Sequence, residues 1–339
     1  MTTEQDSKDL PDIEVGEDHV LAHNVDEEPV EANRRLFEGG LLKFVALLAI
    51  AYSAFHLYSL NIAPLETWSF RIVHIAGALV LGFVLFAGAR FVSSEEGGAR
   101  HRWTTWISAG AMLPALYVLY QTFSFWQMVQ NGAMRIPVEL EVWHFGWPLL
   151  AATGVGIVMS WFHQRERSVF SVPDLVLIVC SLAVAAYFLV VYNTSMRMST
   201  GTSFAPLGIS FAAIAGTALI MELTRRVAGM ALVIIGLVFL AYVFAGPYLP
   251  GFLGYPGLSV QRFFSQVYTD AGILGPTTAV SSTYIILFII FAAFLQSSKV
   301  GDYFVNFAFA AAGRSRGGPA KVSIFASGLM GMINGTSAG

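Results

Sequence analysis

The residues with the clearest chemical potential lie at the end of the sequence, where an apolar run gives way to clustered Gly, Ser, Thr and Asn. Side-chain oxygens and flexible backbone are supplied there by Ser327, Gly331, Asn334, Gly335, Thr336 and Ser337. Membrane carriers build sodium sites from such neutral oxygens and from carbonyls of unwound backbone. The alternative is helix packing, because Gly331 and Gly335 have the G-x-x-x-G spacing. The residue types alone leave both interpretations open.

Other motifs of known chemistry are few. Residues 335–339 spell G-x-S-x-G, the nucleophile elbow of α/β-hydrolases, but that motif requires a preceding strand, which is not available here. No lysine completes a phosphate-binding G-x-x-x-x-G-K-[ST] loop. The single Cys180 excludes an internal disulfide and a multi-cysteine metal site, and we expect it to serve packing. The sequence therefore predicts neither an enzyme nor a bound cofactor.

Composition predicts a protein of the membrane. Apolar residues make up 55% of the chain, charged residues only 12%, and the mean hydropathy is +0.64. From residue 41 the chain becomes a series of apolar runs, each near the roughly 20 residues that a helix needs to cross hydrocarbon. Eight such runs are expected, at residues 41–60, 72–91, 106–125, 146–163, 174–192, 205–224, 228–245 and 280–297. The predicted fold class is an all-α polytopic membrane protein.

The distribution of Lys and Arg predicts the orientation of these spans. Placing the N-terminus inside puts 14 of the 19 cations on cytoplasmic flanks and only Arg71, Arg135, Arg197 and Arg262 outside. The first 38 residues hold 12 of the 22 acids and no apolar period, which predicts a disordered acidic cytoplasmic tail. Two further helices are expected to lie along the membrane surface, one around residues 260–267 and one over residues 300–312.

The ionisable side chains of His56, His74 and Glu222 lie within the predicted spans. His56 and His74 lie in the outer halves of adjacent spans, where an intramembrane His marks either a proton relay or a polar contact. We favour a hydrogen-bonded histidine over a relay. Glu222 precedes Arg225 by three residues near the inner end of the sixth span, a spacing that predicts a local ion pair.

Three motifs in the last third of the chain carry a family resemblance. They are G-D-Y-F at Gly301, G-R-S-R-G-G-P-A-K-V at Gly313 and G-M-I-N-G-T-S-A-G at Gly331. The chain resembles the fused membrane permease of tripartite ATP-independent periplasmic (TRAP) transporters, small plus large subunit, in the branch served by TAXI-type binding proteins. The resemblance is detailed over residues 220–339 and only architectural before them. The family often reads G-x-I-S-G-S-A where this chain has Asn334 and Thr336, which preserves oxygen ligands.

The resemblance implies a division of the chain into four parts. These are a tail at 1–38, a four-span region like the small subunit at 39–170, a connector span at 171–204, and the start of the large transport subunit at 205–339. The last part would end inside a first re-entrant hairpin that enters from the cytoplasmic side. We therefore expect the 339 residues to be an N-terminal fragment that does not transport alone.

The resemblance also implies a function. A TAXI-type extracytoplasmic binding protein would deliver a small organic solute, an organic acid in most of the family, and sodium flow would drive its import across a bacterial or archaeal inner membrane. Sodium is then a coupling ion and not a cofactor, membrane lipid surrounds the chain, and no nucleic acid takes part. Ser327, Gly331 and Gly335 would contribute to the sodium or substrate site, and Asn334, Thr336 and Ser337 would contact sodium itself.

Two other classes of function stay open at this stage. One is a membrane scaffold or assembly subunit without transport activity of its own. The other is an intramembrane enzyme that uses His56 and His74.

Overall fold

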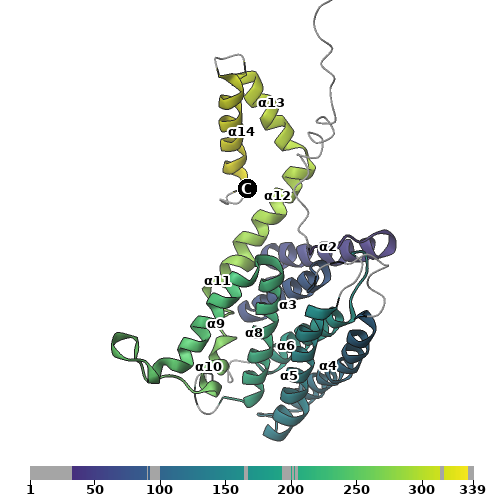
Figure 1. The fold of residues 1–339 in the computed structure, drawn as a ribbon, viewed down its shortest axis with the longest axis vertical. Helices are drawn as coiled ribbons and strands as arrows, with labels where there is room; N and C mark the ends of the chain where they lie inside the picture. Colours follow the sequence, from purple (N-terminus) through teal and green to yellow (C-terminus); the bar gives the residue numbers. More distant parts are fainter. Residues whose placement is uncertain are drawn as a thin grey trace, which may run out of the picture.

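The computed structural model describes residues 33–89, 91, 100–163, 167–192, 200, 202, 205–313 and 317–334 (Figure 1). At residues 100–102, 296, 302, 330 and 332–334 it describes the backbone only. Within these ranges the chain is helical, and the one β-type pairing is an isolated bridge between Arg34 and Phe86. The all-α fold class is confirmed. Most of the predicted tail, residues 1–32, lies outside the described residues.

The first half of the described chain forms a bundle, with helices at α2 (Gly39–Asn61), α3 (Thr67–Leu85), α4 (Arg100–Gln130), α5 (Trp147–Phe162), α6 (Val172–Val191) and α8 (Leu207–Ala228). The second half contains α9 (Met230–Ala245), α10 (Val260–Val267), α11 (Pro276–Val280), α12 (Ile286–Ser297), α13 (Val300–Ala312) and α14 (Gly318–Asn334). Two π-helical segments, η1 (Leu140–Gly146) and η4 (Ser281–Ile285), run directly into α5 and α12, and two 3₁₀ turns, η2 (Gly246–Tyr248) and η3 (Gly251–Leu253), follow α9.

Seven helices of the described chain are long and apolar enough to cross a membrane. They coincide with seven of the eight predicted spans. The remaining prediction, residues 106–125, falls within the 31-residue helix α4, which is long enough but is not among the seven. Polar side chains on α4, among them Ser108, Gln121 and Thr122, are buried and lower the apolar character on which the prediction relied.

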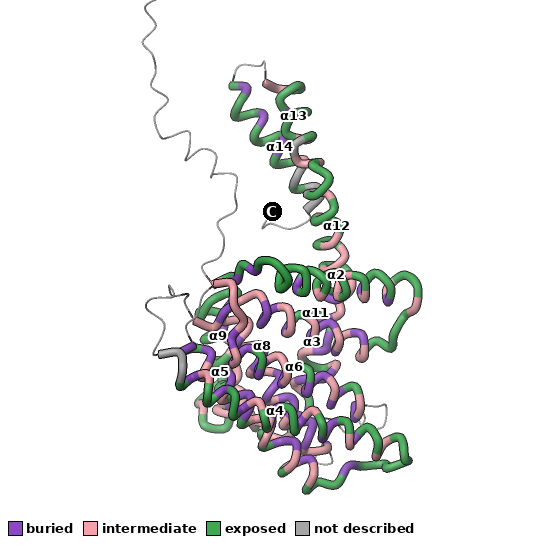
Figure 2. The backbone as a smooth tube through the Cα atoms, turned by 90° about the vertical axis from the view of Figure 1, so that its right-hand side faces the viewer, coloured by how far each residue is buried: buried purple, intermediate pink, exposed green. Residues whose placement is uncertain are grey.

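The core of the bundle forms around α6, which contacts α3, α4, α5 and α8. Its side chains are apolar on nearly every face, as expected for a helix with neighbours all round. Cys180 is fully buried there as a free thiol, which confirms its predicted packing role. By contrast, α2 and α9 are mostly exposed, and Figure 2 shows the exposed surface running along α2. The predicted connector span is therefore the centre of the bundle.

Local signals set the ends of these helices. The Ser171 side chain caps the N-terminus of α6 by accepting a hydrogen bond from the Asp174 backbone N–H. Pro173 occupies the first turn, where proline is favoured because the missing N–H has no partner within the helix. Gly229 separates α8 from α9 with φ of 84°, a conformation that residues with a Cβ rarely adopt. The chain can therefore turn between two spans within one residue.

Helix α10 forms where its apolar period predicts, but its partner differs from the prediction. Phe263, Phe264 and Val267 pack into the main protein core, and α10 contacts α8. The expectation that this face lies on the membrane is wrong for these three residues. The loop that follows is anchored by Tyr268, which is buried and stacks on Phe188 with ring centroids 4.8 Å apart. Burial raises the pKa of the Tyr268 hydroxyl above its ordinary range, so this group stays neutral.

The end of the described chain stands apart from the bundle. Helix α12 leads away from it, and α13 and α14 lie side by side beyond (Figure 1). They share a small apolar cluster of Ala308, Val322 and Ala326, with Ala312 packed against it. The segment predicted as a surface helix at residues 300–312 is thus the first arm of an antiparallel helical hairpin. The second arm also contacts α12.

Candidate functional site

The sodium or substrate site predicted from the sequence falls on α14 as far as the structure describes it. Ser327, Gly331 and Asn334 are four and three residues apart, which places them on one face of the helix. This face points away from Val322 and Ala326, the residues that pack against α13. The side chain of Asn334 and the whole of Gly335, Thr336 and Ser337 lie outside what the structure describes. The role of all six residues in a sodium or substrate site stays a prediction.

The described part of this face is open. Ser327 and Gly331 are exposed, and apart from its chain neighbours and its own helix backbone no atom of the described chain lies within 4 Å of a Cβ built on Gly331. A helix packed on Gly331 would place atoms there, so the described residues show no helix packed against Gly331. A cavity of about 470 Å³ on the hairpin is lined by Ala312, Lys321, Ile324, Phe325, Gly328 and Leu329. Of the predicted site residues that the structure describes with their side chains, neither Ser327 nor Gly331 is among them.

A second polar cluster joins α2, α3 and η4. His56 Nε2 lies 2.9 Å from His74 Nδ1, and His74 Nε2 lies 3.1 Å from Ser281 Oγ. The Tyr52 hydroxyl donates to the His74 carbonyl at 2.9 Å. Gly77 makes room for this ring, since a Cβ at that position would lie 2.3 Å from Tyr52 Cε2. The favoured interpretation of two hydrogen-bonded histidines is confirmed, and their partners are each other, Tyr52 and Ser281.

A cavity of about 410 Å³ adjoins this histidine cluster. It lies between α3, α8 and α11 and is reached by His74, Thr224, Thr278 and Ser281 among mostly apolar side chains. It also extends to Val227 at the C-terminal end of α8. The cavity therefore connects the middle of the bundle with the end of α8 that carries Arg225 and Arg226.

A buried network of charges forms at that end of the bundle. Asp174 at the start of α6 binds Arg35 and, at 2.7 Å, Arg226 of α8. Arg226 also binds Glu222 at 2.7 Å, and Glu222 binds Arg225 at 2.8 Å. The predicted pairing of Glu222 with Arg225 is confirmed, but the sequence did not reveal that it belongs to a network of five side chains.

Carbonyls and aromatic rings complete this charge network. Arg35 donates to the Phe83 and Val84 carbonyls at 2.8 and 2.9 Å, where α3 ends. The Arg226 guanidinium lies 4.9 Å from the centre of the Phe83 ring, and the Trp161 indole N–H donates to Glu222 at 2.9 Å. The network thus fastens the N-terminal segment, α3, α5, α6 and α8 to one another.

A buried carboxylate closes the opposite end of the bundle. Glu141 in η1 is 2% exposed and accepts hydrogen bonds from the Tyr187 hydroxyl at 3.0 Å and the Gly208 backbone N–H at 3.3 Å. Gly208 lies in the first turn of α8, where free N–H groups and the helix dipole favour a negative charge. Glu141 therefore fixes the start of α8 against α6.

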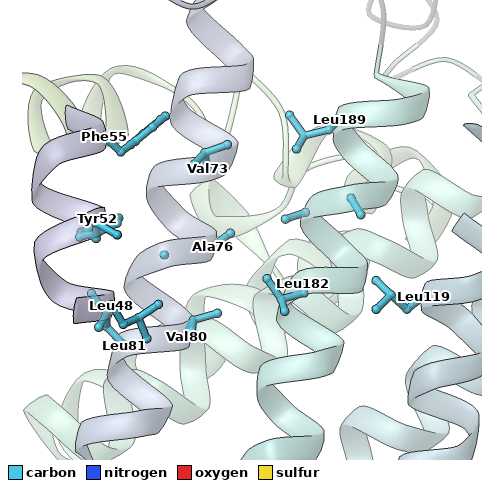
Figure 3. Close-up of a pocket in the computed structure, with 14 residues that line it drawn as sticks. Leu48, Tyr52, Phe55, Val73, Ala76, Val80, Leu81, Leu119, Leu182 and Leu189 are labelled. Carbon is cyan, nitrogen blue, oxygen red and sulfur yellow. The ribbon is translucent and has the colours of Figure 1, made fainter. Parts of the chain in front are cut away.

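An apolar groove runs between α2, α3 and α6 (Figure 3). Its volume is about 540 Å³, and its lining includes Leu48, Phe55, Val73 and Leu182. The groove offers almost no hydrogen-bonding group to a polar solute, so its surface suits hydrocarbon.

Comparison with known proteins gives one match. Residues 215–339 match the family model described as tripartite ATP-independent periplasmic transporter, DctM component. No curated protein and no solved structure matches the chain. The matched stretch begins within α8 and includes all six residues of the predicted site, from Ser327 to Ser337.

The seven apolar helices indicate a multi-pass membrane protein. The family match supports a more specific class, the membrane subunit of a TRAP transporter. Subunits of this family are transport permeases, and the hypothesis of an intramembrane enzyme receives no support from the match.

Proposed function

We propose that this chain is the permease component of a sodium-driven TRAP transporter that imports a small organic acid delivered by a TAXI-type extracytoplasmic binding protein. The observation that carries the proposal is the family match over residues 215–339, which spans the exposed face of α14. Ser327 and Gly331 present a hydroxyl and exposed backbone there, and Asn334 shares their helix face; neutral oxygens and backbone are the ligands suited to a sodium ion. The membrane is then the inner membrane of a bacterial or archaeal cell.

The structure suggests how the work is divided within the chain. The bundle of α3, α4, α5, α6 and α8 has a continuous core and buried ties at both ends, as a stationary scaffold requires. The α13–α14 hairpin has a separate small core and few contacts outside itself and α12. We infer that the hairpin carries the site and that the bundle holds it in the membrane.

Sodium binding at the hairpin is testable by cysteine labelling. Ser327→Cys places a thiol on the exposed face, while the native Cys180 is buried and adds little background. We expect sodium, compared with potassium at equal ionic strength, to slow maleimide labelling of the full chain in nanodiscs by at least about threefold. Ala311→Cys, on the exposed surface of α13, is the matched control and should label equally in both salts. Equal rates at both positions would favour the scaffold subunit without transport activity.

Gly331→Ala separates a binding role from a structural one. The new methyl meets no atom within 4 Å, and alanine favours a helix over glycine by roughly 1 kcal/mol, so the fold should be as stable or slightly more so. If the exposed face of α14 binds sodium, the methyl occupies part of that site. The expected result is unchanged thermal unfolding together with an apparent sodium affinity at least about tenfold weaker in isothermal titration. Unchanged sodium affinity would place the ion elsewhere.

A further inference from the structure

The hydrogen bonds around His56 and His74 fix where the protons lie in the neutral pair. His56 Nδ1 is 2.8 Å from the Tyr52 carbonyl, which can only accept, so this nitrogen carries a proton. The Tyr52 hydroxyl lies 2.9 Å from His74 Nδ1, but its proton goes to the His74 carbonyl, so toward this nitrogen it can only accept. Neutral His56 has a bare Nε2 2.9 Å from the same nitrogen, so His74 Nδ1 carries the proton that both neighbours accept. His74 Nε2 is consequently bare as well, and accepts from the Ser281 hydroxyl at 3.1 Å. The network thus assigns both tautomers.

This arrangement leaves one position for a further proton. The space between the rings is filled by a single N–H, since two N–H groups would point at each other across 2.9 Å. His56 Nδ1 already carries its proton. An added proton can therefore bind only at His74 Nε2, the nitrogen that faces Ser281. Ser281 could then reverse its role and accept the hydrogen bond.

The same nitrogen belongs to the residue that reaches the cavity. Of the two histidines, His56 is fully buried and His74 is 8% exposed, and only His74 lines the cavity of about 410 Å³. A volume of this size accommodates several water molecules, and Thr224, Thr278 and Ser281 offer them hydrogen bonds. The cavity reaches Val227 at the C-terminal end of α8. A route for protons therefore lies beside His74 and not beside His56.

No charged side chain of the described residues contacts His74 Nε2 or the rest of the histidine pair. The titratable groups that contact the pair in the described structure are the two imidazoles themselves and the Tyr52 hydroxyl of α2. On α3 the nearest cation along the chain is Arg71, which donates to the Leu274 carbonyl at 2.7 Å. The described elements η4 and α8 present the hydroxyls of Ser281 and Thr224 at the cavity. A bound proton would thus be held by hydrogen bonds and hydration alone.

We propose that the His56–His74 pair is a binding site for one proton, which enters from the cavity between α3, α8 and α11 and binds at His74 Nε2 against Ser281. The site joins α2 and α3 to the π-helical segment η4, which runs into α12, so its occupancy acts on the contact between these elements. It is independent of the sodium site proposed on α14.

The test is a pH titration of the full chain, labelled with ¹⁵N-histidine, in lipid nanodiscs. Over the pH range in which the protein stays folded, acidification should convert one bare ring nitrogen of the pair to N–H, and that nitrogen should be His74 Nε2. His56→Gln and His74→Gln are the matched variants, because a glutamine amide can replace both hydrogen bonds of either ring. The conversion should persist in His56→Gln and vanish in His74→Gln. His144, which contacts Tyr117, serves as an internal reference, because its signals at a given pH should be the same in the two variants and in the native chain.

Ser281→Ala adds a second measurement. Hydrogen bonds to a charged group are about twice as strong as neutral ones, so loss of the hydroxyl should weaken proton binding by about fivefold. Two bare nitrogens throughout the titration, a new N–H on His56 in place of His74, or unaltered affinity in Ser281→Ala would each overturn the proposal. None of these readouts depends on transport or on sodium, so the outcome is separate from that of the labelling experiment.

Discussion

Replacing Asp174 by Asn is expected to lower the free energy of unfolding by about 3–5 kcal/mol. The carboxylate lies between two buried guanidinium groups, those of Arg35 and Arg226, and is itself 1% exposed. Asparagine keeps the shape but removes the charge. Arg226 would retain Glu222, whereas Arg35 would retain only the carbonyls at the end of α3, so a buried cation would lose its counter-ion. Breaking one partner of a buried pair costs more than the pair itself contributes.

The measurement is unfolding of the purified protein in mixed micelles, followed by helical circular dichroism. Glu139→Gln is the matched control, because Glu139 is an exposed carboxylate and such surface changes usually stay within about 0.5 kcal/mol. In the double variant Asp174→Asn with Arg35→Gln, the destabilisation should be clearly smaller than the sum of the two single effects, since the unpaired cation is gone. Simple additivity would show that Asp174 and Arg35 do not act on each other.

The spans were predictable because a single physical constraint sets their length. Hydrocarbon thickness requires about 20 apolar residues in each helix, and seven of the eight predicted runs lie in helices that are both long and apolar enough. The run at residues 106–125 was predicted as a span, but the polar residues of α4 leave this helix less apolar than the other seven. Hydropathy measures composition and does not register that Ser108, Gln121 and Thr122 of α4 are buried among other helices.

The surface against which an apolar helix face packs was harder to predict than the helix itself. The apolar period at residues 260–267 correctly gave α10, but such a period does not distinguish a membrane surface from a protein surface. Here α8 supplies the apolar partner. The π-helical segments η1 and η4 were not predicted either. An i to i+5 turn leaves little mark on the apolar period, although η1 and η4 deliver Glu141 and Ser281 to their clusters.

The candidate sites were predictable to different degrees. His56 and His74 are nearly equidistant from the short turn between α2 and α3, and antiparallel helices bring such positions to the same depth. Their contact could therefore be expected, whereas that with Ser281 depends on a segment more than 200 residues away. On α14, the spacing of Ser327, Gly331 and Asn334 predicted a shared face because the helix period alone determines it.

A second large effect is expected where α8 begins. Gly208→Ala should lower the free energy of unfolding by about 2–3 kcal/mol, because the new Cβ would lie 2.2 Å from the Tyr187 hydroxyl. That ring has no free direction to move, since Tyr187 is fully buried and stacks on Phe145 with centroids 4.3 Å apart. Any shift also lengthens its hydrogen bond to Glu141, whose carboxylate is buried and has few other donors.

Two further variants distinguish this mechanism from a general intolerance of alanine. Gly154 in α5 has no atom within 4 Å of an added Cβ, so Gly154→Ala should be neutral or stabilising by up to roughly 1 kcal/mol. In the Tyr187→Phe background the obstructing oxygen is absent, and Gly208→Ala should then cost about 1 kcal/mol or less. A full loss of stability in that background would show that the added methyl acts on the backbone of α8 and not on the tyrosine. The steric contact with Tyr187 explains why the first turn of α8 carries a glycine, because only a residue without a Cβ allows Glu141 to hold Tyr187 and the helix N-terminus together.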